Sequence, residues 1–476
     1  MRSILRVNLT SGQCRFETLS RQFAVLGGRG LASMLVFSAP DNTLAIAPGL
    51  LSGGMCASSG RTAVACKNPV DSTIFAANAG GMPGEALARL GIAAVLLEGA
   101  APPDIWQDLI IDAGGACLAR SSVSGVNTYE AMAALAQQYG ENCSFITIGK
   151  AGEACLPVAT VAFSDRGGQP TRHAGGCSGA VMGSKRLKAI IIQKTAAHPP
   201  IADKHAFGTA AGRFADALRT YGRDTGGHDL GKGCAQGCML ACRDGSAGSV
   251  KEDGGIGKWP DYMSLWSASA TPGTIDYANL DRYAYLCNDL GVDAFSVGER
   301  LVLLSKQGVL ERGNAESALA LLEFASRDPR NRQASRLFEH TKGTAETAKS
   351  KTRTEGSVIL DSLGICRFAF KALAESERAR TALAEMLKAR FGSELFVEGL
   401  RASARSVLDA EHSFDPLWPG ALSVSVGQDV EPVRKSVHDV FEAFGHSFGA
   451  ARQIDDQAFS PDARSSPAEH GPGGNG

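Results

Sequence analysis

The sequence has no excess of charge of either sign and no long apolar run. Lysine and arginine (48 residues) nearly balance aspartate and glutamate (49 residues) over 476 residues, so no overall electrostatic field favours nucleic acid or an anionic membrane surface. No stretch approaches the ~20 apolar residues of a membrane-spanning helix, and the N-terminus turns polar before the apolar core of a signal peptide could form. We therefore expect a cytoplasmic protein with small-molecule substrates and with neither nucleic acid nor a membrane as a partner.

A disulfide framework is not expected either, although the chain has 12 cysteines. In a large chain without a secretion signal, cysteines fit reduced thiols and metal ligation better. Cys234, Cys238 and Cys242 recur in the glycine-rich segment GKGCAQGCMLACRDG, which is more typical of a metal-binding loop than of a core segment. Cys366, in ILDSLGICRF, is the candidate for a fourth ligand. Four thiolates suit a [4Fe–4S] cluster or a structural zinc ion.

The chain has two regions with different hydrophobic patterns, and together they predict an α+β fold. Residues 1–195 contain short apolar runs bounded by glycine, asparagine, aspartate and proline, which is the pattern of β-strands. Longer periodic segments begin near residue 204 and predict helices. We expect a glycine-rich β domain over 1–195, mostly α-helical domains over 200–455, and a disordered tail over 456–476, where few apolar side chains remain to offset the entropy of ordering.

Several distinctive strings occur along the chain. They include GGRGL at 27–31, SSGRTAVACKNP at 58–69, ANAGG at 77–81, GAVMGSKRLKAI at 179–190 and LRASARSVLDAEHSFDP at 400–416. Two further segments echo each other, NDLGVD at 288–293 and DSLGIC at 361–366. Together with the cysteine loop, these strings resemble the aldehyde ferredoxin oxidoreductase family, whose members hold tungsten in a pterin cofactor. The resemblance covers roughly residues 1–300 and 355–416.

The resemblance implies a tungsten (or molybdenum) bis-pterin centre with a Mg ion bridging the pterin phosphates, a [4Fe–4S] cluster, and ferredoxin or a similar electron carrier as partner; it leaves a homodimer open. A metal held by the sulfurs of two pterins needs no protein thiolate, so the protein has to hold pterin edges and phosphates. The implied cofactor-binding residues are Arg61, Asn78, Gly179, Lys185, Asn288, Asp293, Asp361 and Ile365. The implied cluster ligands are Cys234, Cys238, Cys242 and Cys366. The β domain would serve as the base of this site.

The chain departs from the family pattern on the substrate side. Where the family has a glutamate–tyrosine–glutamate run after the cysteine loop, this chain has Asp261, Tyr262 and Met263. The interval between the two echoing segments is too short for the family's histidine-bearing segment, and Gly175 stands where the family has an arginine. The cysteine loop also has one extra residue between its first two cysteines. Asp261, as a base, and Tyr262, as a hydrogen-bond donor to a substrate oxygen, remain the candidate catalytic residues.

We therefore expect an oxidoreductase that oxidises an aldehyde or a related carbonyl substrate and delivers electrons to ferredoxin. Two alternatives stay open because the substrate side is shortened. One is a divergent relative that acts on another substrate, including in the reductive direction. The other is a non-catalytic electron-transfer subunit.

Overall fold

The computed structural model describes residues 2–69, 72–165, 170–222, 234–239, 279–311, 314–339, 354–392 and 395–412. The candidate residues Cys242, Asp261 and Tyr262 lie outside the described residues, as does the segment 456–476 for which disorder was expected. Among the described helices, none is both long and apolar enough to cross a membrane.

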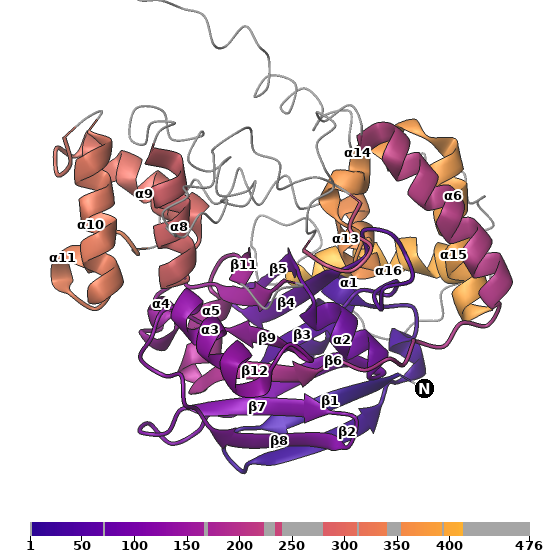
Figure 1. Cartoon of the computed structure of the whole chain (residues 1–476), viewed down its shortest axis with the longest axis horizontal. Helices are drawn as coiled ribbons and strands as arrows, with labels where there is room; N and C mark the ends of the chain where they lie inside the picture. The colour runs from indigo at the N-terminus through magenta and orange to yellow at the C-terminus, as the bar shows by residue number, and fades with distance from the viewer. Residues whose placement is uncertain are drawn as a thin grey trace, which may run out of the picture.

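The N-terminal part folds into two six-stranded sheets that pack on each other (Figure 1). The first sheet contains β1 (Ser3–Asn8), β2 (Gln13–Thr18), β3 (Leu44–Pro48), β4 (Arg61–Lys67), β5 (Ile74–Gly80) and β6 (Ile92–Glu98). The second contains β7 (Gln107–Asp112), β8 (Gly115–Arg120), β9 (Cys143–Thr147), β10 (Val161–Ser164), β11 (Pro170–Ala174) and β12 (Leu187–Gln193). These strands account for the short apolar runs of the sequence.

The two sheets repeat one topology. The strand order is β2–β1–β6–β3–β4–β5 in the first sheet and β8–β7–β12–β9–β10–β11 in the second. The directions repeat too, because β1 with β6 and β7 with β12 are the parallel pairs and the other pairs are antiparallel. A helix follows the second strand of each unit, α1 (Gly28–Phe37) and α3 (Thr128–Tyr139), and another precedes the last strand, α2 (Pro83–Arg89) and α5 (Ser178–Ser184). The base is therefore an internal duplication.

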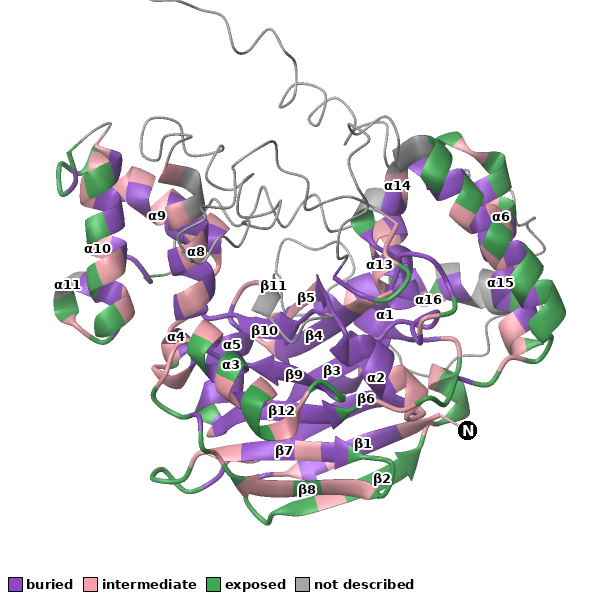
Figure 2. Cartoon of the chain, in the orientation of Figure 1, coloured by how far each residue is buried: buried purple, intermediate pink, exposed green. Residues whose placement is uncertain are grey.

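The base has four layers, in the order helix, sheet, sheet, helix, because successive side chains of each strand point alternately into the central core and toward an outer helix. In β4, Val64 and Cys66 point into the core between the sheets, whereas Ala65 packs under α1. In β12, Ile190 faces the same central core and Ile191 packs under α3. Successive side chains of a strand point to opposite faces, so strands that are covered on both faces read as continuous apolar runs. Buried residues therefore fill the centre of the base, and exposed ones gather on the edge strand β2 (Figure 2).

Two groups of helices stand on one side of this base (Figure 1). One group contains α8 (Leu280–Leu290), α9 (Ala294–Lys306), α10 (Ala315–Arg327) and α11 (Arg332–Ser335). The other contains α6 (Lys204–Gly222), α13 (Glu355–Leu363), α14 (Phe370–Glu375), α15 (Glu377–Phe391) and α16 (Leu395–Glu411), with a 3-10 turn at Arg367–Ala369. The chain thus forms a β-rich domain of short strands followed by helices, which confirms the predicted α+β class.

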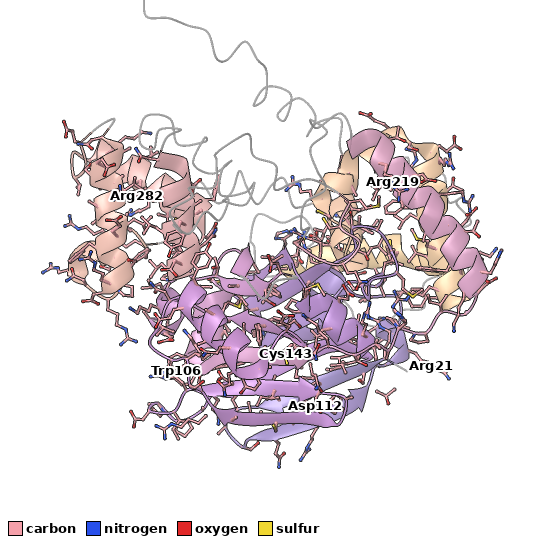
Figure 3. The ribbon with its side chains drawn as sticks, viewed as in Figure 1. Arg21, Trp106, Asp112, Cys143, Arg219 and Arg282 are labelled. Atoms are coloured by element: carbon pink, nitrogen blue, oxygen red, sulfur yellow. The ribbon has the colours of Figure 1, made fainter. Side chains whose placement is uncertain are left out.

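Each helix group has its own apolar core. In the second group, α6 packs on α15 although about 170 residues separate them in sequence, and the ion pair between Arg213 and Glu385 joins the two helices. In the first group, Arg282 of α8, which is labelled in Figure 3, pairs with Glu316 and Glu323 of α10. The two groups are thus separate units: the first meets the base at the end of α8, and the second meets it at the end of α13 and along α16.

The ends of α8 and α13 dock on equivalent points of the two repeated sheets. Both helices stop at a glycine in the left-handed region, Gly291 (φ 79°) and Gly364 (φ 78°), which L side chains rarely adopt. The Gly291 carbonyl accepts the N–H of Thr160 just before β10 (2.9 Å), and the Gly364 carbonyl accepts the N–H of Arg61 at the start of β4 (3.1 Å). The echo between the two sequence segments therefore corresponds to a structural equivalence.

Close backbone contact makes this docking dependent on glycines of the base. A Cβ at Gly49, after β3, would lie 2.2 Å from the Gly364 Cα, and a Cβ at Gly149, two residues after β9, would lie 2.3 Å from the Leu290 carbonyl oxygen. Neither backbone neighbour can rotate away as a side chain could.

We expect Gly149→Ala to lower the free energy of unfolding by about 1–3 kcal/mol, because the new methyl overpacks against backbone. The matched control is Gly212→Ala in α6, where an added Cβ meets nothing within 4 Å. That change should raise stability by about 0.5–1 kcal/mol, since alanine favours the helix. Urea unfolding measures both. Equal stability of the Gly149→Ala protein and the wild type would show that the α8 end does not pack on the base as described.

Candidate cofactor and cluster site

The end of α13 lies in a charged network with the base. Asn78 Nδ2 donates to Asp361 Oδ1 (2.7 Å), and the guanidinium of Arg61 donates to both the side-chain and the main-chain oxygen of Asn78. Arg29 Nη1 lies 3.5 Å from Asp361 Oδ2. Arg29 Nε and Nη2 donate to the two carboxylate oxygens of Glu411, at 2.9 and 2.6 Å. Three of the residues that the resemblance implied, Arg61, Asn78 and Asp361, therefore meet at one point.

Strand pairing explains how the base presents these side chains. Arg61 begins β4 and pairs with Gly80 on β5, while Asn78 pairs with Ala63, so Arg61 and Asn78 are diagonal neighbours across an antiparallel pair. Burial raises the pKa of Asp361, and the nearby guanidinium groups of Arg29, Arg61 and Arg367 oppose that rise. The network concentrates positive charge around one partly buried carboxylate.

Sequence reasoning assigned no role to Arg29 or Glu411. Both are buried, with exposed fractions of 6 % and 2 %, and Ser33 Oγ also donates to Glu411 Oε1 (2.7 Å). Glu411 is the last residue of α16, so this bidentate pair connects the C-terminal end of the described chain to α1 of the base. The sequence did contain a signal for both residues, because Arg29 lies in the distinctive string GGRGL and Glu411 lies in LRASARSVLDAEHSFDP.

We call the turn at Asp361–Cys366 the first turn and the turn at Asn288–Asp293 the second turn. The second turn is built like the first but with different side chains. Asp289 accepts from Asn127 Nδ2 (3.0 Å) and from the Tyr129 N–H at the start of α3 (3.2 Å). Its counterpart in the first turn is Ser362, whose Oγ accepts the Gly30 N–H at the start of α1 (3.0 Å). The residue one place before each, Asn288 or Asp361, is thus set at an equivalent position against the base. Asn288 is buried, with 6 % exposed.

Asp293 follows the second turn and occupies the position that Cys366 has in the first. Its carboxylate caps α9 by accepting the Phe295 N–H (3.2 Å) and Ser296 Oγ–H (2.9 Å). A Cβ on Gly175 would lie 3.5 Å from the carboxyl carbon of Asp293. Gly175, where the family has an arginine, therefore borders the second turn.

The remaining implied cofactor residues are placed differently from one another. Gly179 packs against the backbone beside Thr160, where a Cβ would lie 2.4 Å from the Thr160 carbonyl oxygen, so it supports the second turn. Ile365 is buried in the core of the second helix group, and its N–H donates to Leu360 O (3.1 Å). These two residues have packing roles in the described structure.

Lys185 contacts the base at the other end of β3 from the Asp361 turn. Its ammonium donates to the carbonyl oxygens of Asn42 and Gly99, which precede β3 and follow β6, whereas the Asp361 turn lies against Gly49 at the other end of β3. Burial lowers the pKa of Lys185 to about 8. The described contacts of Lys185 are thus with two loops of the base, and the expectation that the whole turn from 179 to 185 faces the cofactor stays a prediction.

The described part of the cysteine loop lies against the base beside Cys366. The Ser58 N–H donates to the Gly237 carbonyl (3.0 Å), and the Ser58 carbonyl accepts the Cys366 N–H (2.8 Å). A Cβ on Gly80 would lie 2.7 Å from Cys234 Sγ, and a Cβ on Gly60 would lie 2.2 Å from Ala235 Cβ. The glycines of the base thus form a cradle for the loop that contains Cys234 and Cys238.

The cysteines supply thiolates that can bind the iron atoms of an iron–sulfur cluster. Thiolates are the ligands of iron–sulfur clusters, and hydrogen bonds through Ser58 join Cys366 to the loop between Cys234 and Cys238. Within the described ranges, no three His, Cys, Asp or Glu side chains are gathered closely enough to hold a metal ion. The fourth cysteine, Cys242, lies outside those ranges. The residues that are described fit a cluster by their chemistry and by the cradle around them.

We expect Glu411→Ala to destabilise the protein by about 3–5 kcal/mol, because it leaves the Arg29 guanidinium buried without its bidentate partner. Glu385→Ala is the matched control, since the Arg213–Glu385 pair also joins distant helices but is 38 % and 40 % exposed; exposed pairs contribute about 0.2–1 kcal/mol. Denaturant unfolding compares the two variants. A loss below about 1 kcal/mol for Glu411→Ala would show that this buried pair does not tie α16 to the base.

Comparison with known proteins agrees with this architecture. The family model for the aldehyde ferredoxin oxidoreductase N-terminal domain matches residues 4–194, and the model for domains 2 and 3 of the same family matches residues 209–328. The chain belongs to the aldehyde ferredoxin oxidoreductase family. Neither model reaches residues 355–412, which carry Asp361 and Cys366, so it is the structure that places these two residues against the base.

Curated relatives of this chain include two tungsten-containing aldehyde ferredoxin oxidoreductases. The Pyrococcus furiosus protein is 30% identical over 359 residues, which cover 62% of this chain and 57% of the relative. The Thermococcus kodakarensis protein is 29% identical over 357 residues, with the same coverage of 62% and 57%. The match thus spans 57% of the length of each of these relatives.

A solved structure shares the fold. It is the active site complex BamBC of benzoyl coenzyme A reductase, determined with 1,5-dienoyl-CoA. The TM-score is 0.63 at 14% sequence identity, and the match covers 87% of this chain and 88% of that chain. At this identity the likeness concerns the fold alone.

Proposed function

We propose that the protein is an oxidoreductase with a tungsten or molybdenum bis-pterin centre and one [4Fe–4S] cluster. It exchanges two electrons with an aldehyde or a related carbonyl substrate and single electrons with a ferredoxin-type carrier. One observation supports this most strongly: the duplicated base holds two equivalent turns, at Asn288–Asp293 and Asp361–Cys366. A cofactor made of two identical pterins requires two equivalent binding positions.

The polar groups at the two turns suit pterin edges and phosphates. Asp361 and Asn288 hold equivalent places, and a carboxylate or an amide complements the N–H groups of a pterin edge. Asn78 and Arg61 meet beside Asp361, where an amide oxygen can bind Mg and a guanidinium can bind phosphate. Bound there, the cofactor would supply a metal that takes up two electrons at once.

The cluster ligands in this proposal are Cys234, Cys238, Cys242 and Cys366. Cys366 lies two residues after Gly364, whose carbonyl is bound to Arg61. A cluster on Cys366 is therefore adjacent to the Asp361 turn and to the base. This short covalent and hydrogen-bonded connection suits the transfer of single electrons between the two centres.

Asp261 and Tyr262 are our proposed catalytic residues. Asp261 would accept a proton during attack on the carbonyl carbon, and Tyr262 would donate a hydrogen bond to the substrate oxygen. Met263, which stands in place of an acid, removes one proton-accepting group from this side. A chain limited in this way could also act on another substrate, or reductively.

Metal and pterin analysis of protein purified without oxygen tests the proposal. We expect about four iron atoms per chain, as one [4Fe–4S] cluster requires, together with tungsten or molybdenum and pterin. Cys238→Ser and Cys366→Ser should abolish the broad iron–sulfur absorbance, whereas Cys155→Ser, at an exposed position, should retain it. Iron without pterin metal would leave only an electron-transfer subunit, and zinc alone would overturn the cluster.

Asp261→Asn should lower aldehyde-dependent reduction of a viologen dye by about 10²–10⁴-fold in kcat, since that is the usual contribution of one acid–base group. Iron, pterin metal and absorbance should stay at wild-type values. Met263→Glu, which adds a carboxylate next to Tyr262, should raise the rate. Unchanged turnover in Asp261→Asn would remove Asp261 from the mechanism; activity only with reduced dye and a carboxylic acid would reverse the assigned direction.

A further inference from the structure

Ser58 connects the two parts of the cysteine site with three different polar atoms. Its N–H donates to the Gly237 carbonyl (3.0 Å) and its carbonyl accepts the Cys366 N–H (2.8 Å). Its Oγ accepts the Met239 N–H (3.2 Å). Gly237 and Met239 flank Cys238. Ser58 is therefore hydrogen-bonded to both neighbours of Cys238 and to Cys366.

The backbone of Ser58 is held in a conformation that few side chains adopt. Its φ is +55°, in the left-handed region where glycine is the usual residue. The side chain is 3 % exposed. A non-glycine residue in this region is strained and persists only where surrounding contacts hold it. Because glycine would fit this backbone with less strain, a use for the hydroxyl would account for the serine.

The hydroxyl of Ser58 makes a different set of contacts with the described residues from that of its neighbour Ser59. Among the described residues, Ser58 Oγ is an acceptor only, from Met239. The neighbouring Ser59 is equally buried, at 2 % exposed, but its Oγ donates to the carbonyls of Leu51 (3.0 Å) and Cys56 (2.7 Å). Two adjacent buried serines therefore differ in one respect, since only Ser58 keeps a donor available at the cysteine loop.

We propose that the Ser58 hydroxyl donates a hydrogen bond to a sulfur atom of the iron–sulfur cluster, either a bound sulfide or a cysteine thiolate. This inference rests on the cluster of the proposed function. Hydrogen bonds to cluster sulfurs favour the reduced form, which carries one more negative charge, and so raise the reduction potential. Ser58 is thus a positioning and tuning residue: its backbone holds the cysteine loop beside Cys366 and its hydroxyl sets the potential.

A redox titration followed by electron paramagnetic resonance tests the proposal on the full chain. Ser58→Ala and Ser58→Gly both lose the hydroxyl, but only the glycine variant also relieves the left-handed backbone. Both should shift the cluster potential downward by a similar amount. Ser59→Ala is the matched control and should keep the wild-type potential, because its hydroxyl is used by the backbone. The signal reports only loaded protein, so incomplete loading of a variant does not hide the shift.

The outcomes separate this inference from the function on which it rests. A wild-type potential in both Ser58 variants would overturn the hydrogen bond while leaving the cluster in place. An equal shift in Ser59→Ala would also overturn it, since the effect would then come from general loosening of the loop. Wild-type protein without any cluster signal would overturn the proposed function itself, and the role of Ser58 with it.

Discussion

The structure depends on how two helix ends are held against one duplicated base. Each helix stops at a left-handed glycine, and a backbone N–H of the underlying sheet binds the glycine carbonyl, from Thr160 to Gly291 and from Arg61 to Gly364. Gly149 and Gly49 allow the backbones to approach too closely for any side chain. Because the contacts are between backbones, the spacing of the two turns is set by the sheets rather than by flexible side chains.

Side chains then give the two equivalent positions different chemistry. The first turn carries Asp361 in a network of guanidinium groups, and Cys366 follows it toward the cysteine loop. The second carries the neutral Asn288, and Asp293 follows it as the cap of α9. One scaffold used twice thus yields one turn that leads to Cys366 and the cysteine loop and one that ends in a helix cap. We propose that this asymmetry gives the cofactor a single electron exit, on the side of Cys366.

Part of this arrangement could be predicted from the sequence. The short apolar runs and the later helical periodicity gave the α+β class, and the echo between 288–293 and 361–366 marked the two turns. The duplication was not predicted, because the halves share strand order rather than visible sequence, and a repeated topology depends on pairings between residues far apart. The contacts of Lys185 could not be predicted either. It belongs to a distinctive string, but only the structure shows that its ammonium donates to the carbonyls of Asn42 and Gly99.

We propose that the two turns together hold one metal between two pterins. X-ray absorption at the tungsten or molybdenum edge of anaerobically purified protein tests it most directly, because it counts the sulfur atoms bound to the metal. The account predicts about four sulfur neighbours, two from each pterin, with no cysteine thiolate among them. About two sulfur neighbours, or a count that falls when Cys366 is replaced, would contradict it.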